Sequence, residues 1–525
     1  MAQRYPMRGD GVPRWVVRMV WQGRALAWSS DGALVAGLDA LIVGPVEIDA
    51  MSDTLDLDGS DIRETVSLSL PWLEDAQPKD LQDRYVEVAL VPASGWTNRY
   101  SMATGRVTRT LLDRPGALVG IEISPEDFTD RVYPPATWTV SDRTHPLTDN
   151  EYVLSLFPQW MTPTDISTYV SITDGPREEA YGAGYPVLYG YSESTQHPAI
   201  TSVPMAPAPV IDDSGTDPSK VADKILVAAG TLATDDLVVW GLAEDDLLYR
   251  IEVDSADIIY GVDYLGQSYT AVDVHTENSS ARKGDWYVST TANAAPTATA
   301  GVGHITEWLL SQVGAVDVAY CGEATARTAS LPIGGYIDEP VRPLAWAQER
   351  VSGTYPIAMS RAPTGRLRLA YVPYTGGAPV AELVDGSGGV YRSGDVKEMG
   401  NRGTTQVEIR YRYSVARERY LSTLTLSDGP REDTLQSDTL ELDDAYTDAT
   451  AGIAAQYYLW RQRYRREISL DASVEDYGWL RPGHIVRYSD ADLGISSALY
   501  IVLSIERTDR PFTAIRLTPI AADAR

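Results

Sequence analysis

The sequence predicts a mainly β, multi-domain fold with a few helices, of the α+β type. The chain has 525 residues, more than one hydrophobic core usually organises, so we expect three or four domains. Short alternating runs of apolar and polar residues, separated by Gly, Pro, Asp and Asn, dominate both ends of the chain, as in half-buried strands. Only a few segments show helical spacing, and 44% apolar residues suffice for real cores.

Residues 1–130 are predicted to form an N-terminal β-barrel domain. Alternating runs at 14–21 (RWVVRMVW), 65–70 (TVSLSL) and 85–91 (YVEVALV) indicate the short strands of a small barrel or sandwich. A last pair of strands flanks Asp113-Arg114-Pro115-Gly116. This is a turn signal, because proline presets its own φ and glycine can adopt a positive φ.

The middle of the chain divides by composition. Residues 131–222 are rich in Pro, Gly, Ser and Thr, which predicts a connecting region. Residues 223–340 are predicted to form a central β-rich accessory domain with one helix, at 303–313. In that helix, Ile305, Trp308, Leu309 and Val313 share one face, which we expect to be buried.

Residues 341–525 are predicted to form a C-terminal α+β region that includes a second β-barrel. A helix at 341–351 has Pro343 in its first turn, a hairpin at 359–372 turns at Gly365, and 405–415 alternates as a strand does. The segment 447–467 is the strongest helix signal, with Thr447 or Asp448 as N-cap and Arg461, Arg463, Arg465 and Arg466 near its end. Strands follow to the end.

The charge argues against a protein that grips nucleic acid over a wide surface. Acidic residues outnumber basic ones by 73 to 44, which gives a formal net charge of −29. The arginines at 461–466 fit the cation preference of a helix C-terminus better than a nucleic-acid patch. No apolar run reaches the length of a membrane span and no signal peptide is evident, so we expect folding in a cytoplasm.

No catalytic or cofactor motif emerges from the sequence, so we expect no enzyme activity and no cofactor. The single cysteine, Cys321, is expected to be a small buried thiol rather than a nucleophile. None of the histidines has the spacing of a metal site: His145, His197, His275, His304 and His484. Nucleotide-binding loops and the nucleophile elbow of hydrolases are also lacking.

The one metal candidate is LDLDGSD, in which Asp56, Asp58 and Asp61 surround a glycine. Calcium loops of the EF-hand type need a third acidic position before the glycine and a glutamate at the loop end. Both are missing, so the sequence favours a turn that connects two strands over a calcium site.

A short internal echo links the two ends of the chain. Residues 113–115 and 509–511 are both Asp-Arg-Pro, and each tripeptide stands between two predicted strands. A second repeat, DGPRE at 174–178 and 428–432, lies in an order that one collinear duplication cannot produce. The first repeat is kept as a hint of two related β-barrels.

The last 185 residues resemble the tail hub proteins of long-tailed bacteriophages and gene transfer agents. The resemblance is carried by an alanine-rich helix that ends in arginines, a strand, an L-x-P-G-x-x-V turn, a later glycine and an A-x-Y-x-V-x-S-I strand. The positions concerned are Leu480, Pro482, Gly483, Val486, Gly494, Tyr500, Val502 and Ser504. His484 departs from the pattern, since the family often has Asp after Pro-Gly. The first 130 residues and YPVLYGYS at 185–192 match more loosely.

The resemblance implies a structural protein of the virion, at the tail tip or baseplate, without catalysis. Two tail-tube-like β-barrel domains per chain would let a homotrimer present six similar units to a sixfold tail tube. Implied partners are distal tail or tail tube proteins, the tape measure protein and tail fibre or receptor-binding proteins. Genome DNA would pass through the ring without specific binding, and assembly would occur in the host cytoplasm.

Two alternatives remain open at this point. A virion-associated or secreted protein that binds or hydrolyses glycans would also be β-rich, acidic and aromatic, and would need two carboxylates in a common cleft. The spike hub of a contractile secretion system shares the pair of barrels, but would normally be followed by a β-helical needle.

Overall fold

The computed structural model describes residues 14–133 and 187–520, with gaps in both ranges. The gaps are 22–23, 56, 58–65, 72–80, 83, 93, 113–117, 126–127, 132, 191–205, 208–209, 214–220, 230–236, 244–247, 252, 256, 265–266, 277–280, 291–300, 338–340, 395, 400–403, 415–417, 428–435, 463–464 and 508–511. The described chain is mainly β with a few helices, as predicted. Most of the expected connecting region, residues 131–222, falls outside it.

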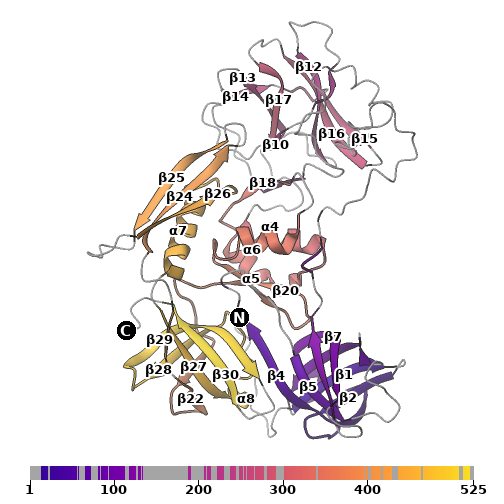
Figure 1. Ribbon diagram of the computed structural model, residues 1–525, viewed down its shortest axis with the longest axis vertical. Coiled ribbons are helices and arrows are strands. Elements are labelled where there is room, and N and C mark those ends of the chain that lie inside the picture. Colours follow the sequence, from indigo (N-terminus) through magenta and orange to yellow (C-terminus); the bar gives the residue numbers. More distant parts are fainter. Residues whose placement is uncertain are drawn as a thin grey trace.

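The N-terminal strands form one half of the lower body in Figure 1. They are β1 (Arg14–Trp21), β2 (Arg24–Ser29), β3 (Leu41–Pro45), β4 (Glu47–Thr54), β5 (Val66–Pro71), β6 (Tyr85–Val91), β7 (Tyr100–Leu112) and β8 (Leu118–Ser124), with a short 3-10 helix at Trp96–Asn98. The predicted alternation holds in β5, where Val66, Leu68 and Leu70 are buried and their neighbours are partly exposed. Alternate residues therefore supply the core of this half.

The C-terminal strands form the other half of the lower body. They are β21 (Ala381–Val384), β22 (Val390–Arg392), β23 (Lys397–Met399), β27 (Arg465–Ser473), β28 (Ile485–Asp490), β29 (Ile495–Arg507) and β30 (Phe512–Pro519), with the short helix α8 (Val474–Tyr477) after β27. Their buried side chains make a separate core around Leu470, Tyr488 and Tyr500. Tyr488 and Tyr500 meet edge to face, with ring centroids 5.6 Å apart.

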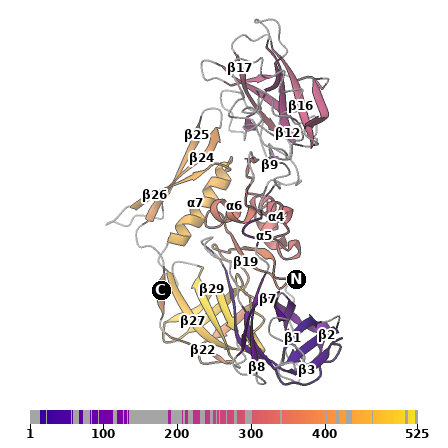
Figure 2. The ribbon, with the colours of Figure 1, turned by 45° about the vertical axis from the view of Figure 1, so that its right-hand side comes forward.

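A single sheet runs through both halves. Along its main path the strand order is β22-β27-β30-β29-β4-β5-β8-β7-β6-β1-β2-β3, so β29 and β4 are neighbours although about 450 residues separate them. Figures 1 and 2 show the yellow C-terminal strands and the indigo N-terminal strands side by side at this place. The two ends of the chain are thus held in one hydrogen-bonded surface.

Helices and a hairpin form the middle of the molecule. They are α4 (Val302–Gln312), the 3-10 turn η5 (Val318–Tyr320), α5 (Gly322–Arg327), α6 (Pro343–Arg350), β19 (Ile357–Arg361) and β20 (Leu367–Tyr371). The predicted face of α4 is buried, and it shares a core with α6 and with the hairpin strands. This core therefore continues across residue 340. Pro343 occupies the first turn of α6, as expected.

Cys321 is fully buried, as predicted for a small apolar thiol. Its sulfur lies 3.4 Å from the amide nitrogen of Leu369 and 3.4 Å from the carbonyl oxygen of Asp317. Burial raises the pKa of the Cys321 thiol to about 12, so the thiolate does not form near neutral pH.

A three-stranded sheet packs on the longest helix beside this middle layer (Figure 2). The sheet has the order β25-β24-β26, from β24 (Thr404–Ser414), β25 (Arg419–Ser427) and β26 (Gln436–Leu442), and the helix is α7 (Asp448–Gln462). Thr447 is the N-cap, because its hydroxyl accepts the backbone N–H of Thr450 at 3.1 Å. Val407, Ile409 and Tyr411 turn their side chains into the core beneath.

The predicted helix 447–467 ends earlier than its pattern indicated. The helix stops at Gln462, and Arg465 already opens β27, whose first residues pair with β23 and therefore have extended backbone. Arg463 lies outside the described residues, while Arg461 donates to the carbonyl oxygen of Gly353 at 2.6 Å. Arg461 thus has the structural role that the sequence favoured, near the end of a helix, but the four arginines do not all lie at that helix end.

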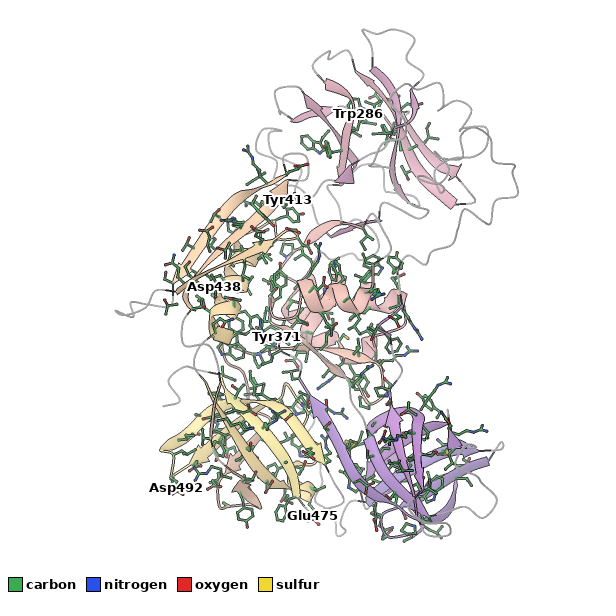
Figure 3. All side chains as sticks on the ribbon, in the orientation of Figure 1. Trp286, Tyr371, Tyr413, Asp438, Glu475 and Asp492 are labelled. Atoms are coloured by element: carbon green, nitrogen blue, oxygen red, sulfur yellow. The ribbon has the colours of Figure 1, made fainter. Side chains whose placement is uncertain are left out.

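Two further sheets lie at the top of Figure 1. One has the order β10-β17-β13-β14 and the other β11-β12-β16-β15. Their strands are β10 (Ala206–Pro207), β11 (Val210–Asp213), β12 (Val221–Ala229), β13 (Leu237–Ala243), β14 (Leu248–Ile251), β15 (Ile258–Tyr264), β16 (Gln267–Thr276) and β17 (Ala281–Thr290). Trp240 and Trp286 are buried in this part, and Figure 3 marks Trp286 there. Below it, β9 (Val187–Gly190) pairs with β18 (Gly334–Ile337).

Within the described ranges, no helix is both long and apolar enough to cross a membrane.

Candidate functional site

The lower body contains the same five-strand arrangement twice. In the N-terminal unit, β6, β7, β8, β5 and β4 lie side by side in that order. In the C-terminal unit, β28, β29, β30, β27 and then β22 with β23 lie in the corresponding order. All these pairs are antiparallel, and the chain visits the strands in the same sequence in both units. The two units therefore share one topology.

The irregularities of the two units also coincide. The β6–β7 register shifts after Val88, and the β28–β29 register shifts after Tyr488. The β7–β8 register shifts after Val107, and the β29–β30 register shifts after Val502. Bulges sit at specific places in a sheet, so two matching bulges bring the two units into residue-by-residue correspondence.

The Asp-Arg-Pro echo falls in the same connection of each unit. Residues 113–115 lie between β7 and β8, and residues 509–511 lie between β29 and β30. Both tripeptides are outside the described residues, but the strands on either side of each are described. The tripeptides thus stand in the same connection of the repeated topology.

The two units meet at a short seam between β29 and β4. Ser504, Ile505, Glu506 and Arg507 face Thr54, Asp53, Ser52 and Met51, and the amide of Leu55 donates to the carbonyl oxygen of Leu503 at 2.8 Å. Arg507 is only 2% exposed. Its guanidinium donates to the carbonyl oxygens of Gly478 and Leu480 at 3.0 and 2.6 Å, which ties the seam to the segment before the Pro-Gly turn.

Most residues of the predicted turn motif belong to the core of the C-terminal unit, and Gly494 lies in the turn before β29, at the end of that strand away from the seam. Leu480, Val486, Tyr500 and Val502 all belong to the core of the C-terminal unit. Gly483 has φ +88°, and its amide donates to the carbonyl oxygen of Val502 at 2.8 Å. Gly494 has φ +69° in the turn between β28 and β29. Glycine is needed at both positions because a Cβ is strained at such φ values.

Three regions of the chain join around the Pro-Gly turn. Arg368 of β20 donates to the carbonyl oxygen of Pro482 at 2.8 Å. Arg481 reaches the carbonyl oxygen of Ser101 in β7 at 3.0 Å. The hydroxyl of Thr104, also in β7, donates to the carbonyl oxygen of Pro363 at 2.6 Å. The turn therefore begins β28 and also fixes the hairpin and the two units to one another.

The contacts around the Pro-Gly turn form a joint between the hairpin and the two units. His484, where the sequence departs from the tail hub pattern, is neutral in this joint. Its Nδ1 accepts the backbone N–H of Arg481 at 3.1 Å. Burial, and then the positive charges of Arg368, Arg481 and Arg507, lower the pKa of His484 to about 3. Three guanidinium groups would also suit an aspartate at this position.

Because of this lowered pKa, the stability of the joint is expected to depend on pH. The unfolded chain binds a proton at His484 near pH 6.5, but the folded chain does so only near pH 3. The stability present above pH 6.5 is therefore lost as the pH falls toward 3, at up to about 1.4 kcal/mol per pH unit. Urea unfolding at pH 7.5 and pH 5 measures this loss.

His484→Asn is the matched variant, since its amide oxygen can accept the Arg481 N–H but does not titrate. We expect the variant to lose less stability than the parent chain between pH 7.5 and pH 5. The same loss in both proteins would show that His484 does not contribute to the pH dependence.

The metal candidate receives no structural test. Asp56, Asp58 and Asp61 all lie outside the described residues. Among the residues that the structure does describe, no three His, Cys, Asp or Glu side chains gather in a way that could hold a metal ion.

Sequence reasoning missed the polar residues that hold the joint and the core. Arg368, Arg481 and Arg507 lie far apart in the chain and bind mainly backbone carbonyl groups, which leave no trace in sequence. Asp490, fully buried and paired with Arg392 at 3.2 Å, was also missed. The available signal was an acidic residue two positions after Tyr488, in phase with the buried side of the alternating stretch IVRYSD.

Comparisons with solved structures give distant likenesses. The tail protein from Neisseria meningitidis MC58 is 11% identical, with 96% of each chain covered and a TM-score of 0.40. The prophage MuSo2 43 kDa tail protein from Shewanella oneidensis is 9% identical over 98% of this chain and 99% of that one, with a TM-score of 0.36.

A chain from the virion of a native gene transfer agent particle is 12% identical over 66% of this chain and 87% of that one, with a TM-score of 0.43. No protein-family model and no curated protein sequence matches. These three solved structures are of a tail protein, a prophage tail protein and a gene transfer agent virion.

Proposed function

We propose that this chain is a structural tail hub, three copies of which form a ring between the tail tube and the tail tip. The observation that carries the proposal is the repeated five-strand unit, joined edge to edge in one sheet. Each unit would be one β-barrel of the pair expected for a hub. Three chains would then present six similar units, which matches a sixfold tube by symmetry.

The seam fits a wall past which DNA must slide. The exposed residues of β4 are Glu47, Asp49, Ser52 and Thr54, of which the last two lie at the seam, and Glu506 is exposed beside them on β29. Among the described residues of these two strands, no exposed side chain is Lys or Arg. We place the channel wall on this face, because acidic and hydroxyl groups do not hold phosphates by counterion release.

The net charge of the chain favours the same role. Three chains at −29 carry about −87, which repels DNA over distances near the Debye length. In this role the chain is not an enzyme. It would contact tail tube proteins on one side, receptor-binding or tail fibre proteins on the other, and the tape measure protein along the axis.

Light scattering of the full chain, coupled to size exclusion, tests the proposal. We expect a species of three times the 57.4 kDa chain mass at high protein concentration, because the ring closes only with three copies. Electron microscopy of particles with a labelled chain should place it at the tail tip. A monomer at every concentration, or a label elsewhere in the virion, would contradict the hub.

A further inference from the structure

The repeated topology shows which edges of the sheet have no partner among the described strands. In the C-terminal unit, β29 extends past the end of its ladder with β28 at Ile501, and this extension forms the seam with β4. In the N-terminal unit, β7 likewise extends past the end of its ladder with β6 at Arg106. On that side of β7, beyond Arg106, no described strand is paired.

The matching bulges make the correspondence of these extensions specific. Val107 and Val502 stand at equivalent bulges, so Arg109, Thr110 and Leu111 correspond to Ser504, Ile505 and Glu506. The exposed fractions of the corresponding side chains differ, as expected if β29 has a partner strand here and β7 has none among the described strands. Ser504 is 8% and Ile505 0% exposed, whereas the Arg109 side chain is 61% exposed and Thr110 is half-buried.

The equivalent of β4 is also open. Val66 pairs with Ile123, and Ile468 pairs with Leu517, at corresponding positions of the two units. Lys397 pairs with Glu467, one position before Ile468, and so corresponds to Ser52, one position after Met51. Strand β23 therefore corresponds to Ser52–Thr54, and among the described strands it pairs only with β27.

From these two open edges we propose that β7 of one copy pairs antiparallel with β23 of the next copy. The new seam repeats the register of the seam within the chain, so Leu111 faces Lys397 of a second copy as Glu506 faces Ser52. Leu111 is one of the few large apolar side chains left exposed, at 45%. The inference rests on the proposed hub, since it specifies how its subunits join.

This pairing explains why the assembly stops growing. The two edges are different surfaces, so the contact is head-to-tail and closes only if the rotation between copies divides a full turn. Three seams within chains would alternate with three seams between chains in the same backbone register, with Arg109 and Lys397 at the positions that Ser504 and Ser52 hold within the chain. No β7 or β23 edge would then remain open, which removes the aggregation hazard of unpaired strands.

Engineered disulfides test the register. Leu111→Cys combined with Lys397→Cys should, on mild oxidation, give covalent dimers and trimers on a non-reducing gel and nothing larger. Directly opposed residues of antiparallel strands have Cα atoms about 4.5–5.5 Å apart, which suits a disulfide. Ser52→Cys with Glu506→Cys is the matched control, and should cross-link only within the chain. The buried Cys321 can stay in both variants.

Control variants and light scattering distinguish a wrong strand pairing from a wrong assignment as a hub. Each single cysteine variant, and Leu111→Cys with Thr425→Cys on the distant strand β25, should give no trimer band. If light scattering shows trimers before oxidation but Leu111→Cys with Lys397→Cys gives no cross-link, the hub stands and the pairing is wrong. Monomers throughout would overturn both, and a ladder beyond trimer would overturn the closed ring.

A charge pair gives a second readout without oxidation. Leu111→Lys would place an ammonium group opposite Lys397 of the next copy, whereas Leu111→Glu would place a carboxylate there. The lysine variant should dissociate at roughly two- to fivefold higher protein concentration than the glutamate variant, from the usual size of cross-strand charge effects. Both changes are on an exposed side chain and should leave the unfolding of the single chain unchanged. Equal association of the two variants would contradict the register.

Discussion

Asp490→Ala is expected to lower the free energy of unfolding of the C-terminal unit by about 3–5 kcal/mol, the range for breaking a buried ion pair. The Asp490 carboxylate is fully buried and lies 3.2 Å from the Arg392 guanidinium. It also accepts the Tyr488 hydroxyl at 2.9 Å and the Leu493 amide at 3.0 Å. Alanine would leave all three donors without this acceptor, and one of them, the Tyr488 hydroxyl, is fully buried.

Asp492→Ala is the matched control for Asp490. Asp492 lies near the same arginine, at 3.9 Å from Arg392, but its side chain is 81% exposed, and Figure 3 marks it at the outer edge of the unit. An exposed pair of this kind contributes less than about 1 kcal/mol. The hydrogen-exchange rates of the β28 and β29 amides should rise strongly in Asp490→Ala and little in Asp492→Ala. Thermal unfolding of the two variants gives the corresponding change in stability. Equal effects would show that burial of the pair is unimportant.

Local patterns predicted the elements because the forces that form them are local. Alternation located β5 and β6 within one or two residues, and helical spacing located α4, because each element buries one face. The Pro-Gly turn and the hairpin glycine were found for the same reason, since positive φ restricts the residue type. The end of α7 was missed because the pairing of residues 465–467 with β23 is a tertiary interaction.

The arrangement of the elements was much less accessible from sequence. The residues of β4 do not predict that its partner is β29, because any strand with alternating apolar residues can pair with another. The Asp-Arg-Pro echo falls in the same connection of both units, but three matching residues carried little weight without the strands on either side of them. The candidate joint was predicted only in its turn, since the carbonyl groups that Arg368 and Arg481 bind belong to every residue alike.

Gly365→Ala is expected to separate the β19–β20 hairpin from the N-terminal unit and to cost about 2–4 kcal/mol, from backbone strain and a lost hydrogen bond. Gly365 has φ +80°, and a Cβ there would overlap the carbonyl oxygen of Thr104 in β7. The hairpin must then move away, which breaks the hydrogen bond from the Thr104 hydroxyl to Pro363. It also opens a small hollow lined by Val66, Ala103, Ile123 and Ala362.

Gly394→Ala separates this overlap from simple backbone strain, because Gly394 has a similar φ of +85° with nothing within 4 Å of its Cβ position. It should cost only the left-handed strain, about 1–2 kcal/mol. Gly365→Ala should therefore unfold at the lower temperature of the two. Cleavage by a protease where the hairpin contacts the N-terminal unit should increase in this variant alone. Equal thermal stability of the two alanine variants would show that a Cβ at residue 365 does not push the hairpin away from β7. The joint would then depend on the arginine contacts of the Pro-Gly turn.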